Sequence, residues 1–196
     1  MNHLGTIDLK TKRLLLRKFF VDDAEKSYYN WTSDEKVTVY LRWQKHKSIE
    51  ETKQLFTQWN DNYKANNYYQ WAIILRKDEY LGPIGTISVN RLDEHINMAH
   101  LGYCIGSQWW HKGITSEALH EIIRFLFKEV KVNRIESWHD PKNKYSGSVM
   151  KKCGMIYEGT LKEGDYNNTG IVDACVYAIT SREFKSFNIY EEYFRE

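Results

Sequence analysis

The segment that decides the fold is Leu101–Phe127, LGYCIGSQWWHKGITSEALHEIIRFLF. Leu101–Ile105 mixes apolar and small side chains and predicts a short strand, which turns at Gly106-Ser107-Gln108. Apolar residues then recur at helical spacing and predict a long helix with one core-facing side; they are Ile114, Ala118, Leu119, Ile122, Ile123, Leu126 and Phe127. The first amides of a helix lack intrahelical acceptors and point toward an anion. Lys112-Gly113-Ile114-Thr115-Ser116 adds a cation and two hydroxyls there, so the segment predicts a phosphate-binding turn.

Two common phosphate-binding motifs do not fit this turn. A Walker loop requires Gly, four residues and then Gly-Lys-Ser/Thr, but Gly106 and Gly113 have the wrong spacing and Lys112 precedes its glycine. A dinucleotide fingerprint requires three spaced glycines, which the turn lacks. The phosphate ligand must therefore belong to another class.

Composition favours one globular domain over residues 1–196. A hydrophobic content of 42%, with 15% aromatic residues, is enough for a sizeable core and excludes a disordered chain. The net charge of +2 comes from interspersed charges, so nucleic-acid binding is not expected as the main activity. Cys104, Cys153 and Cys175 are widely spaced, which favours free thiols over a disulfide framework or a zinc site. No apolar run approaches the ~20 residues that span a bilayer, so we expect no membrane segment and a cytoplasmic location.

The rest of the chain alternates helices with about seven strands. The expected strands are residues 13–18, 69–75, 81–90, 98–105, 134–139, 155–161 and 171–179. Three helices are expected in the first half of the chain: one from Asp22 or Asp23 through Trp31, a short one from Ser33, and one from the capping box Ser48-x-x-Glu51. Two more are expected over 114–127 and 146–152. A last helix follows the capping box Thr180-x-x-Glu183 and carries Phe184, Phe187, Tyr190 and Phe194. This order predicts an α/β (α+β type) fold with a mixed, mostly antiparallel sheet flanked by helices. The 114–127 helix then joins strands 98–105 and 134–139 in parallel.

The phosphate-binding turn resembles motif A of the GNAT N-acetyltransferases, Arg/Gln-x-x-Gly-x-Gly/Ala, which holds the coenzyme A pyrophosphate. The matching positions run from Trp110 to Thr115. Two positions depart from the motif, because Trp110 replaces Arg/Gln and Thr115 replaces Gly/Ala. A Trp at the first position, with Glu-Ala-Leu further on, is similar to the sequences of the ribosomal-protein N-terminal acetyltransferase-like (Rim-type) branch. Glu117-Ala118-Leu119 completes that pattern.

A second segment resembles the same branch. Asn143-x-x-Ser146, an apolar pair, Lys152-Cys153-Gly154-Met155 and then Glu158-Gly159 follow the Rim-type order, with Met155 in place of the usual Phe. The opening Thr11-Lys12-Arg13-Leu14-Leu15-Leu16-Arg17 is similar to the start of that branch. The resemblance covers roughly residues 11–184 and implies a GNAT fold in which the parallel strands 98–105 and 134–139 splay apart.

The resemblance implies acetyl-CoA as cosubstrate, bound in that gap, with no metal. The amides of residues 103–105 would hold the pantetheine arm and stabilise the thioester carbonyl. Its expected contacts are Tyr103, Cys104, Ile105, Trp110, His111, Lys112, Gly113, Ile114, Thr115, Ser116, Asn143 and Ser146. Cys104 is a poor candidate for an acyl-carrying nucleophile because the sequence offers it no His partner.

Two sets of catalytic residues remain open. His100 occupies the place of a Glu that many GNAT enzymes use, and its ordinary pKa suits general base catalysis. The resemblance to some Rim-type enzymes implies a different pair, made by the serine of Asn-x-x-Ser and a carboxylate in the last hairpin. Ser146 matches that serine, and Asp165 lies near the position of the carboxylate. In this pair the serine donates to the departing thiolate. An α-amine, with a pKa near ~8, needs a weaker base than a lysine side chain at ~10.4.

Three functions fit these motifs. The resemblance implies acetylation of a protein or peptide N-terminal α-amine, by an enzyme that is a monomer or homodimer. A polyamine or aminoglycoside acceptor would require an acidic cleft, for which Asp22, Asp23, Asp34, Glu35, Glu50 and Glu51 are available. A non-catalytic acyl-CoA-binding module is the third reading. Aromatic side chains can hold a cationic or peptidic acceptor, and the candidates for that wall are Trp31, Tyr40, Trp43 and Trp71.

Overall fold

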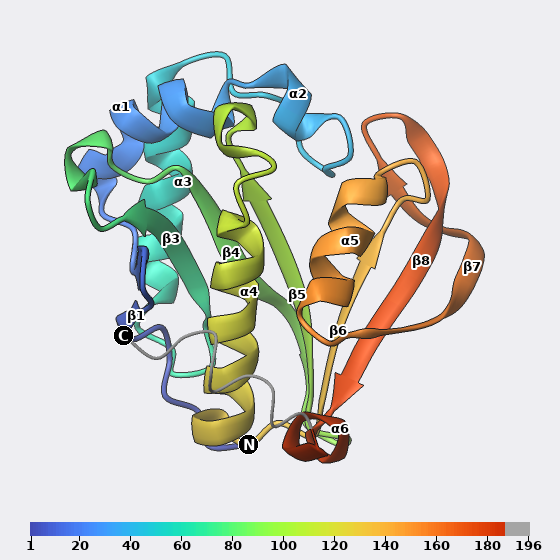
Figure 1. The fold of residues 1–196 in the computed structure, drawn as a ribbon. Coiled ribbons are helices and arrows are strands. Elements are labelled where there is room, and N and C mark those ends of the chain that lie inside the picture. The colour runs from blue at the N-terminus through green and yellow to red at the C-terminus, as the bar shows by residue number, and fades with distance from the viewer. Residues whose placement is uncertain (187–196) are drawn as a thin grey trace.

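The computed structural model describes residues 1–186, which form one mixed sheet with helices on both faces (Figure 1). Phe187, Tyr190 and Phe194 of the expected last helix lie outside these residues. Within residues 1–186 the sheet has eight strands in the order β1-β2-β3-β4-β5-β6-β8-β7. The strands are β1 (Leu9–Lys10), β2 (Leu14–Arg17), β3 (Gln70–Leu75), β4 (Gly85–Asp93), β5 (Met98–Ile105), β6 (Arg134–His139), β7 (Ile156–Asn167) and β8 (Gly170–Thr180). This confirms the predicted mixed fold, with the two-residue β1 added to the seven expected strands.

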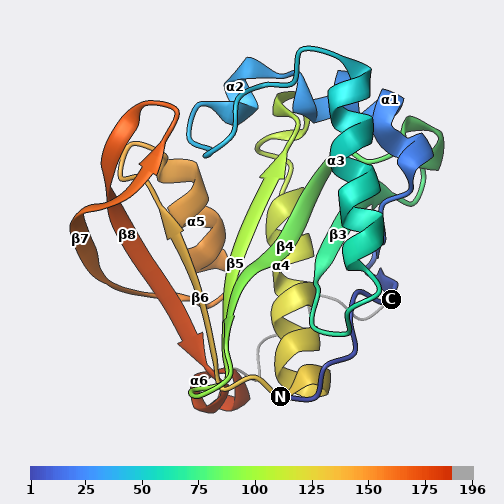
Figure 2. The same ribbon diagram turned by 180° about the vertical axis from the view of Figure 1, so that it is seen from behind.

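Only β5 and β6 pair in parallel, while all other neighbouring strands of the described sheet are antiparallel. The helix α4 (Ile114–Phe125) connects them, as its predicted apolar stripe requires, and a wider helical turn continues to Val130. In Figures 1 and 2, β5 and β6 lie together near α6 (Ser181–Ser186) and diverge toward the opposite end of the sheet.

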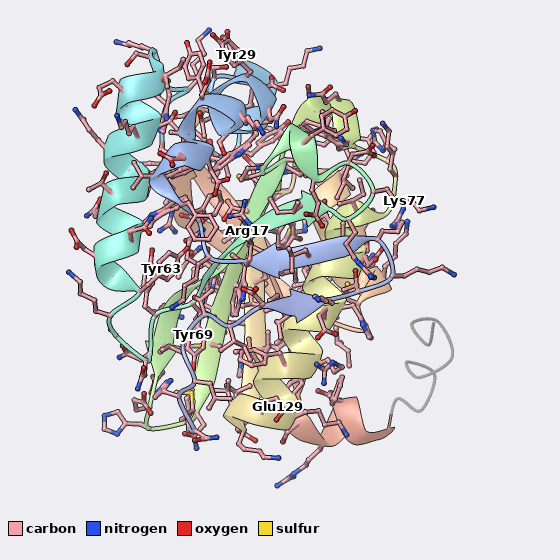
Figure 3. The ribbon with its side chains drawn as sticks, turned by 90° about the vertical axis from the view of Figure 1, so that its left-hand side faces the viewer. Arg17, Tyr29, Tyr63, Tyr69, Lys77 and Glu129 are labelled. Carbon is pink, nitrogen blue, oxygen red and sulfur yellow. The ribbon has the colours of Figure 1, made fainter. Side chains whose placement is uncertain are left out.

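The two faces of the sheet carry different helices. α4 and α5 (Lys144–Lys152) cover one face, and α3 (Ile49–Asn62) covers the other, which Figure 2 shows from behind. Seen from the β1–β2 edge in Figure 3, α3 and α4 stand on opposite sides of the strands. Near the end of α3, the Tyr63 hydroxyl donates to the Gln70 carbonyl at 2.8 Å and fixes the helix on β3.

Strand alternation divides the core into two clusters. Leu101 and Ile105 of β5 pack with the α4 residues Ile114, Leu119 and Ile122 on one face. On the other face, Phe19, Trp31 and Phe56 form a smaller aromatic cluster against Ala72 and Ile74 of β3, and Cys104 packs on it. The two faces of β5 therefore point to different helical layers.

Local hydrogen bonds explain where the helices begin. Ser48 Oγ accepts the Glu51 amide at the start of α3, as predicted, while the Glu51 carboxylate accepts the Lys47 amide. Thr180 and Glu183 form the expected capping box of α6. The cap of α2 (Glu35–Thr38) was predicted wrongly, because Asp34 accepts the Lys36 amide and the Ser33 hydroxyl donates instead to the Tyr28 carbonyl.

The expected helix through Trp31 is a continuous helical segment of three types. It comprises a 3-10 turn (Val21–Asp23), α1 (Ala24–Ser27) and a π-turn (Tyr28–Thr32). Further 3-10 turns occupy Glu79–Leu81 and Ser107–Trp109, and β4 begins at Gly85 rather than at the predicted residue 81.

Candidate active site

The centre of the candidate site is the place where β5 and β6 separate. In this fully described part of the sheet only three residue pairs connect the strands, and the last is His100 with Glu136. The Ser137 hydroxyl then donates to the Leu101 carbonyl at 2.9 Å, which holds the vertex of the opening. Beyond it, Tyr103–Ile105 has no strand partner on the β6 side, so the predicted splay is confirmed.

The start of α4 forms an anion-binding turn beside this opening. Gly113 (φ 72°) and His111 (φ 61°) take left-handed conformations that turn the chain into the helix. A Cβ at Gly113 would meet only Arg13, at 3.6 Å, so the space in front of the helix amides is open. The first amides of a helix have no intrahelical acceptor, the first residues of α4 line a pocket, and Lys112 precedes them, so the residues present fit a pyrophosphate.

Glu117 fixes this turn to the neighbouring strands. Its side chain is buried, and its carboxylate accepts from Thr11 Oγ1 at 2.6 Å, from the Arg13 amide at 2.9 Å and from Arg13 Nε at 2.5 Å. Arg13 also donates to the Lys112 carbonyl at 2.9 Å. The sequence motif included Glu117 but did not predict this structural role. The feature that could have indicated it is an acidic residue on the first turn of an otherwise apolar helix.

Two pockets meet at the opening. The smaller, of about 340 Å³, lies between α2, α4 and α5 and includes the α4 start, and we refer to it as the α4–α5 slot. The larger, of about 740 Å³, extends to α3 and the loop between α2 and α3, and we refer to it as the α3-side cleft. The residues that line both are Tyr40, Leu41, Tyr103, Cys104, Asn143 and Ser146. A ligand that enters the slot therefore ends next to a second ligand in the cleft.

Ser146 lies at this meeting point. Asn143 caps α5 by accepting the Ser146 amide at 3.3 Å, which places the serine in the first turn of the helix. The Ser146 hydroxyl is 3.0 Å from the Tyr103 hydroxyl, which also donates to the Ser146 carbonyl at 3.0 Å. Burial raises the pKa of Tyr103 well above its usual range, so this phenol stays protonated. Sequence reasoning had assigned only the Tyr103 backbone to the site.

His100 faces the α3-side cleft from β5, at the last paired position. Its Nδ1 is 3.3 Å from Glu136 Oε1, and its ring contacts Trp138 edge-on. Glu136 also accepts from Arg91 at 2.8 Å and from Arg134 at 3.3 Å. The hydrogen bond from His100, together with Arg134, holds the pKa of the Glu136 carboxyl below its usual range, so Glu136 is an anion next to the imidazole.

Asp165 lines the α3-side cleft, but its hydrogen-bond partners in the described structure differ from the serine that the sequence suggested. Its carboxylate accepts from Arg42 at 2.5 Å and from the Tyr166 amide at 2.7 Å. Ser146 is bonded to Tyr103 instead. In the described residues, Ser146 and Asp165 therefore do not form a direct hydrogen bond with each other.

The expected aromatic wall is formed in part. Trp31, Tyr40 and Trp43 line the α3-side cleft. Trp71 does not, because its side chain points to the other face, is 0% exposed in the α4-side core and donates to the Ile7 carbonyl at 2.8 Å. The expectation for Trp71 was therefore wrong, and strand alternation is the reason. Trp59 and His46 line the cleft and were not predicted.

Cys104 lines both pockets, at the opening. Burial raises the pKa of its thiol to about 12, which disfavours a thiolate nucleophile. No cluster of three His, Cys, Asp or Glu side chains suited to a metal ion occurs among the described residues. None of the described helices is both long and apolar enough to cross a membrane.

A mixed sheet split beside an anion-binding helix start is the arrangement that the resemblance to acetyl-CoA-dependent transferases implied, and comparison with known proteins gives the family. Residues 13–156 match the acetyltransferase (GNAT) domain. The chain belongs to this family and is an N-acetyltransferase that uses acetyl-CoA.

Relatives agree over most of the chain. It is 33% identical to the uncharacterized N-acetyltransferase YnaD of Bacillus subtilis over 90% of this chain and 98% of that protein. It is 28% identical to the ribosomal-protein-serine acetyltransferase of Escherichia coli over 70% of this chain and 75% of that protein. A solved GNAT acetyltransferase from Bacillus anthracis is similar with a TM-score of 0.77 and 28% identity, covering 90% of this chain and 99% of that one.

Proposed function

We propose that this enzyme acetylates the N-terminal α-amine of a peptide or protein. The observation that carries the proposal is the charge of the α3-side cleft. Among its described lining residues the only acids are Asp140 and Asp165, against Arg42 and Arg91. Asp165 pairs with Arg42, and Asp140 accepts from the Lys142 amide at 2.8 Å and from Asn167 at 2.9 Å.

A polycationic acceptor fits this cleft poorly. None of the six acids that an acidic cleft would have used is among its lining residues. Asp23 pairs with Arg17, Asp34 accepts the Ser107 amide at 3.1 Å, and Glu35 pairs with Lys45 at 2.6 Å. A peptide N-terminus brings one positive charge, which must be lost before it reacts, so it needs no acidic wall. The similarity to a ribosomal-protein-serine acetyltransferase supports the same acceptor class.

The two pockets divide the reaction between them. Acetyl-CoA supplies an activated thioester, at which an amine forms the amide bond as the CoA sulfur leaves. In our proposal the α4 start and Lys112 bind the phosphates, and the amides of Tyr103–Ile105 hold the arm and stabilise negative charge on the carbonyl oxygen. Trp110, His111, Ile114, Thr115 and Ser116 form the remaining contacts around the turn, as the sequence suggested.

In our proposal His100 takes the proton of the amine and Ser146 stabilises the departing sulfur. His100 faces the cleft, and Nδ1 bonded to the anionic Glu136 leaves Nε2 to accept the proton of the attacking amine. Ser146 donates a hydrogen bond that stabilises the departing thiolate, which leaves as CoA and takes its proton from water, and the Tyr103 hydroxyl positions Ser146 Oγ. Asp165 with Arg42 forms the outer wall of the cleft, where it orients the acceptor chain.

The proposal is tested by CoA release with a panel of acceptors. Peptides with a free and a blocked α-amine, each with and without lysine, are compared with spermidine and an aminoglycoside. We expect release only with a free α-amine. Release only with spermidine or the aminoglycoside would contradict the proposal, and so would acetyl-CoA binding without release on any acceptor.

A further inference from the structure

The pairing of β4 with β5 contains a bulge beside the α3-side cleft. The two strands pair in register as far as Val89 and Leu101. Pairing resumes with Arg91 opposite His100, so Asn90 is an extra residue that has no partner on β5. A bulge redirects a side chain, and bulges are frequent beside active sites. Here the redirected side chain is that of Asn90, which is exposed and lines the cleft.

Ser88 and Gly102 fix the orientation of the Asn90 amide. Ser88 Oγ donates to Asn90 Oδ1 at 2.8 Å, which holds the oxygen on that side and turns Nδ2 away from it. Nδ2 lies over Gly102, because a Cβ on that residue would overlap it. Gly102 is also the β5 partner of Ser88. The glycine therefore provides the space that the amide group occupies.

The Nδ2 donor is available to a ligand in the cleft. Within the described residues, the side chain of Asn90 forms its hydrogen bond through Oδ1, and Nδ2 has no protein acceptor. His100, Gly102 and Cys104 alternate along one face of β5, and all three line the cleft. Nδ2 therefore lies over the strand position between the proposed base and Cys104, which lies at the opening of the sheet.

We propose that Asn90 Nδ2 donates a hydrogen bond to the carbonyl oxygen of the acceptor's first residue. The inference rests on the proposed function and narrows its substrate class to amines with a carbonyl group on the adjacent carbon, as in every peptide N-terminus. His100 and Gly102 are two residues apart on a strand, about 7 Å. A hydrogen bond at each end and the short N–C–C–O link of the peptide can span this distance. A lysine side chain or spermidine has no such carbonyl and gains nothing from this donor.

The test compares a short peptide with an analogue in which a trans-alkene replaces the first peptide bond. The analogue keeps the α-amine but lacks the carbonyl oxygen. Asn90→Ala should lower kcat/KM for the peptide about three- to tenfold, because one hydrogen bond is lost, and should leave kcat/KM for the analogue unchanged. The wild type is compared with the variant separately for each acceptor, which cancels the different basicity of the two amines. The KM for acetyl-CoA should not change.

Gly102→Ala provides a second variant, because the added Cβ takes the space of the Asn90 amide and should lower the ratio of peptide to analogue in the same direction. Asn67→Ala is the matched control, since Asn67 is an exposed asparagine of the α3–β3 loop and lines neither pocket. It should leave every value unchanged. If Asn90→Ala slows both acceptors equally, or slows neither, the inference is wrong while the proposed function stands. If no peptide α-amine reacts, both are wrong.

Discussion

At the scale of single residues, Ser146 and Tyr103 connect the two pockets. Both hydroxyls lie at the opening, 3.0 Å apart, and come from different elements, α5 and β5. The sequence predicted a role for Ser146 from a motif, but the contact of the Tyr103 side chain with α5 was not predicted. Such a contact depends on tertiary packing and cannot be inferred from the local spacing of residues.

Removal of the Ser146 hydroxyl should slow the chemical step. For Ser146→Ala we expect kcat to fall by about 10²-fold, since in our proposal the departing sulfur loses its hydrogen-bond donor. The KM for acetyl-CoA should change little, because the α4 start, which we propose binds the phosphates, is unaltered. Tyr103→Phe should have a smaller effect of the same kind, and the double variant should be no slower than Ser146→Ala if the two act as one unit. Steady-state kinetics test this; an unchanged kcat in Ser146→Ala would refute the role.

His120 makes the stability of the fold sensitive to mild acid. It is buried on α4, and burial, with Arg124 nearby, lowers its pKa to about 4. The unfolded chain protonates this histidine near pH 6.5 and the folded chain does not, so stability is full above pH 6.5 and falls as the pH drops toward 4. Between pH 7 and 5 the loss should be about 1–2 kcal/mol.

Urea unfolding at pH 7 and at pH 5 measures this loss. His120→Gln should remove most of the difference between the two curves, whereas His95→Gln, at an exposed position, should leave it as in the wild type. Equal pH dependence in all three proteins would show that His120 is not responsible.

At the scale of elements, α5 lies against β6 through a glycine. A Cβ on Gly147 would lie 2.5 Å from Nε2 of His139, whose Nδ1 is tied to the Asp140 carbonyl at 2.8 Å. The ring has little freedom to move because it also packs on Tyr177. The glycine therefore sets the distance between helix and sheet, and with it the position of Ser146.

Gly147→Ala tests this contact. Helix propensity alone would favour alanine by about 1 kcal/mol. The clash should outweigh it and cost about 1–3 kcal/mol, with a lower kcat because Ser146 moves. Ser148→Ala, on the exposed side of the same helix, is the control for stability and should be neutral or slightly stabilising. A more stable Gly147→Ala protein, measured by thermal unfolding, would contradict the account.

The elements that the sequence predicted best are those whose pattern is local. The bounds of β5 and β6 match the expected 98–105 and 134–139, and α4 follows its apolar stripe. β8 matches the expected 171–179 closely, but β7 runs to Asn167 where the prediction ended at residue 161, because residues 162–167 are polar or glycine apart from Tyr166 and lack an alternating apolar pattern. The position of Trp71 could not be predicted because it depends on which face of the sheet each strand residue points to. The Glu117–Arg13 ion pair could not be predicted because it joins segments that are distant in the sequence.

At the scale of the whole molecule, two pockets meet at the opening of the split sheet, one bounded by α4 and α5 and the other by α3 and the aromatic residues of the N-terminal third. Because the chain belongs to the GNAT family, we assign the slot to acetyl-CoA. In our proposal the cleft binds the acceptor; its acids are already bonded, and its lining includes the aromatic residues Trp43 and Trp59.

The most direct measurement is to locate the acetyl group on a peptide that offers both kinds of amine. A peptide with a free N-terminal α-amine and an internal lysine is incubated with enzyme and acetyl-CoA, and tandem mass spectrometry identifies the modified nitrogen. The account predicts one acetyl group on the α-amine and an unmodified lysine. Acetylation of the lysine with the α-amine left free would contradict it.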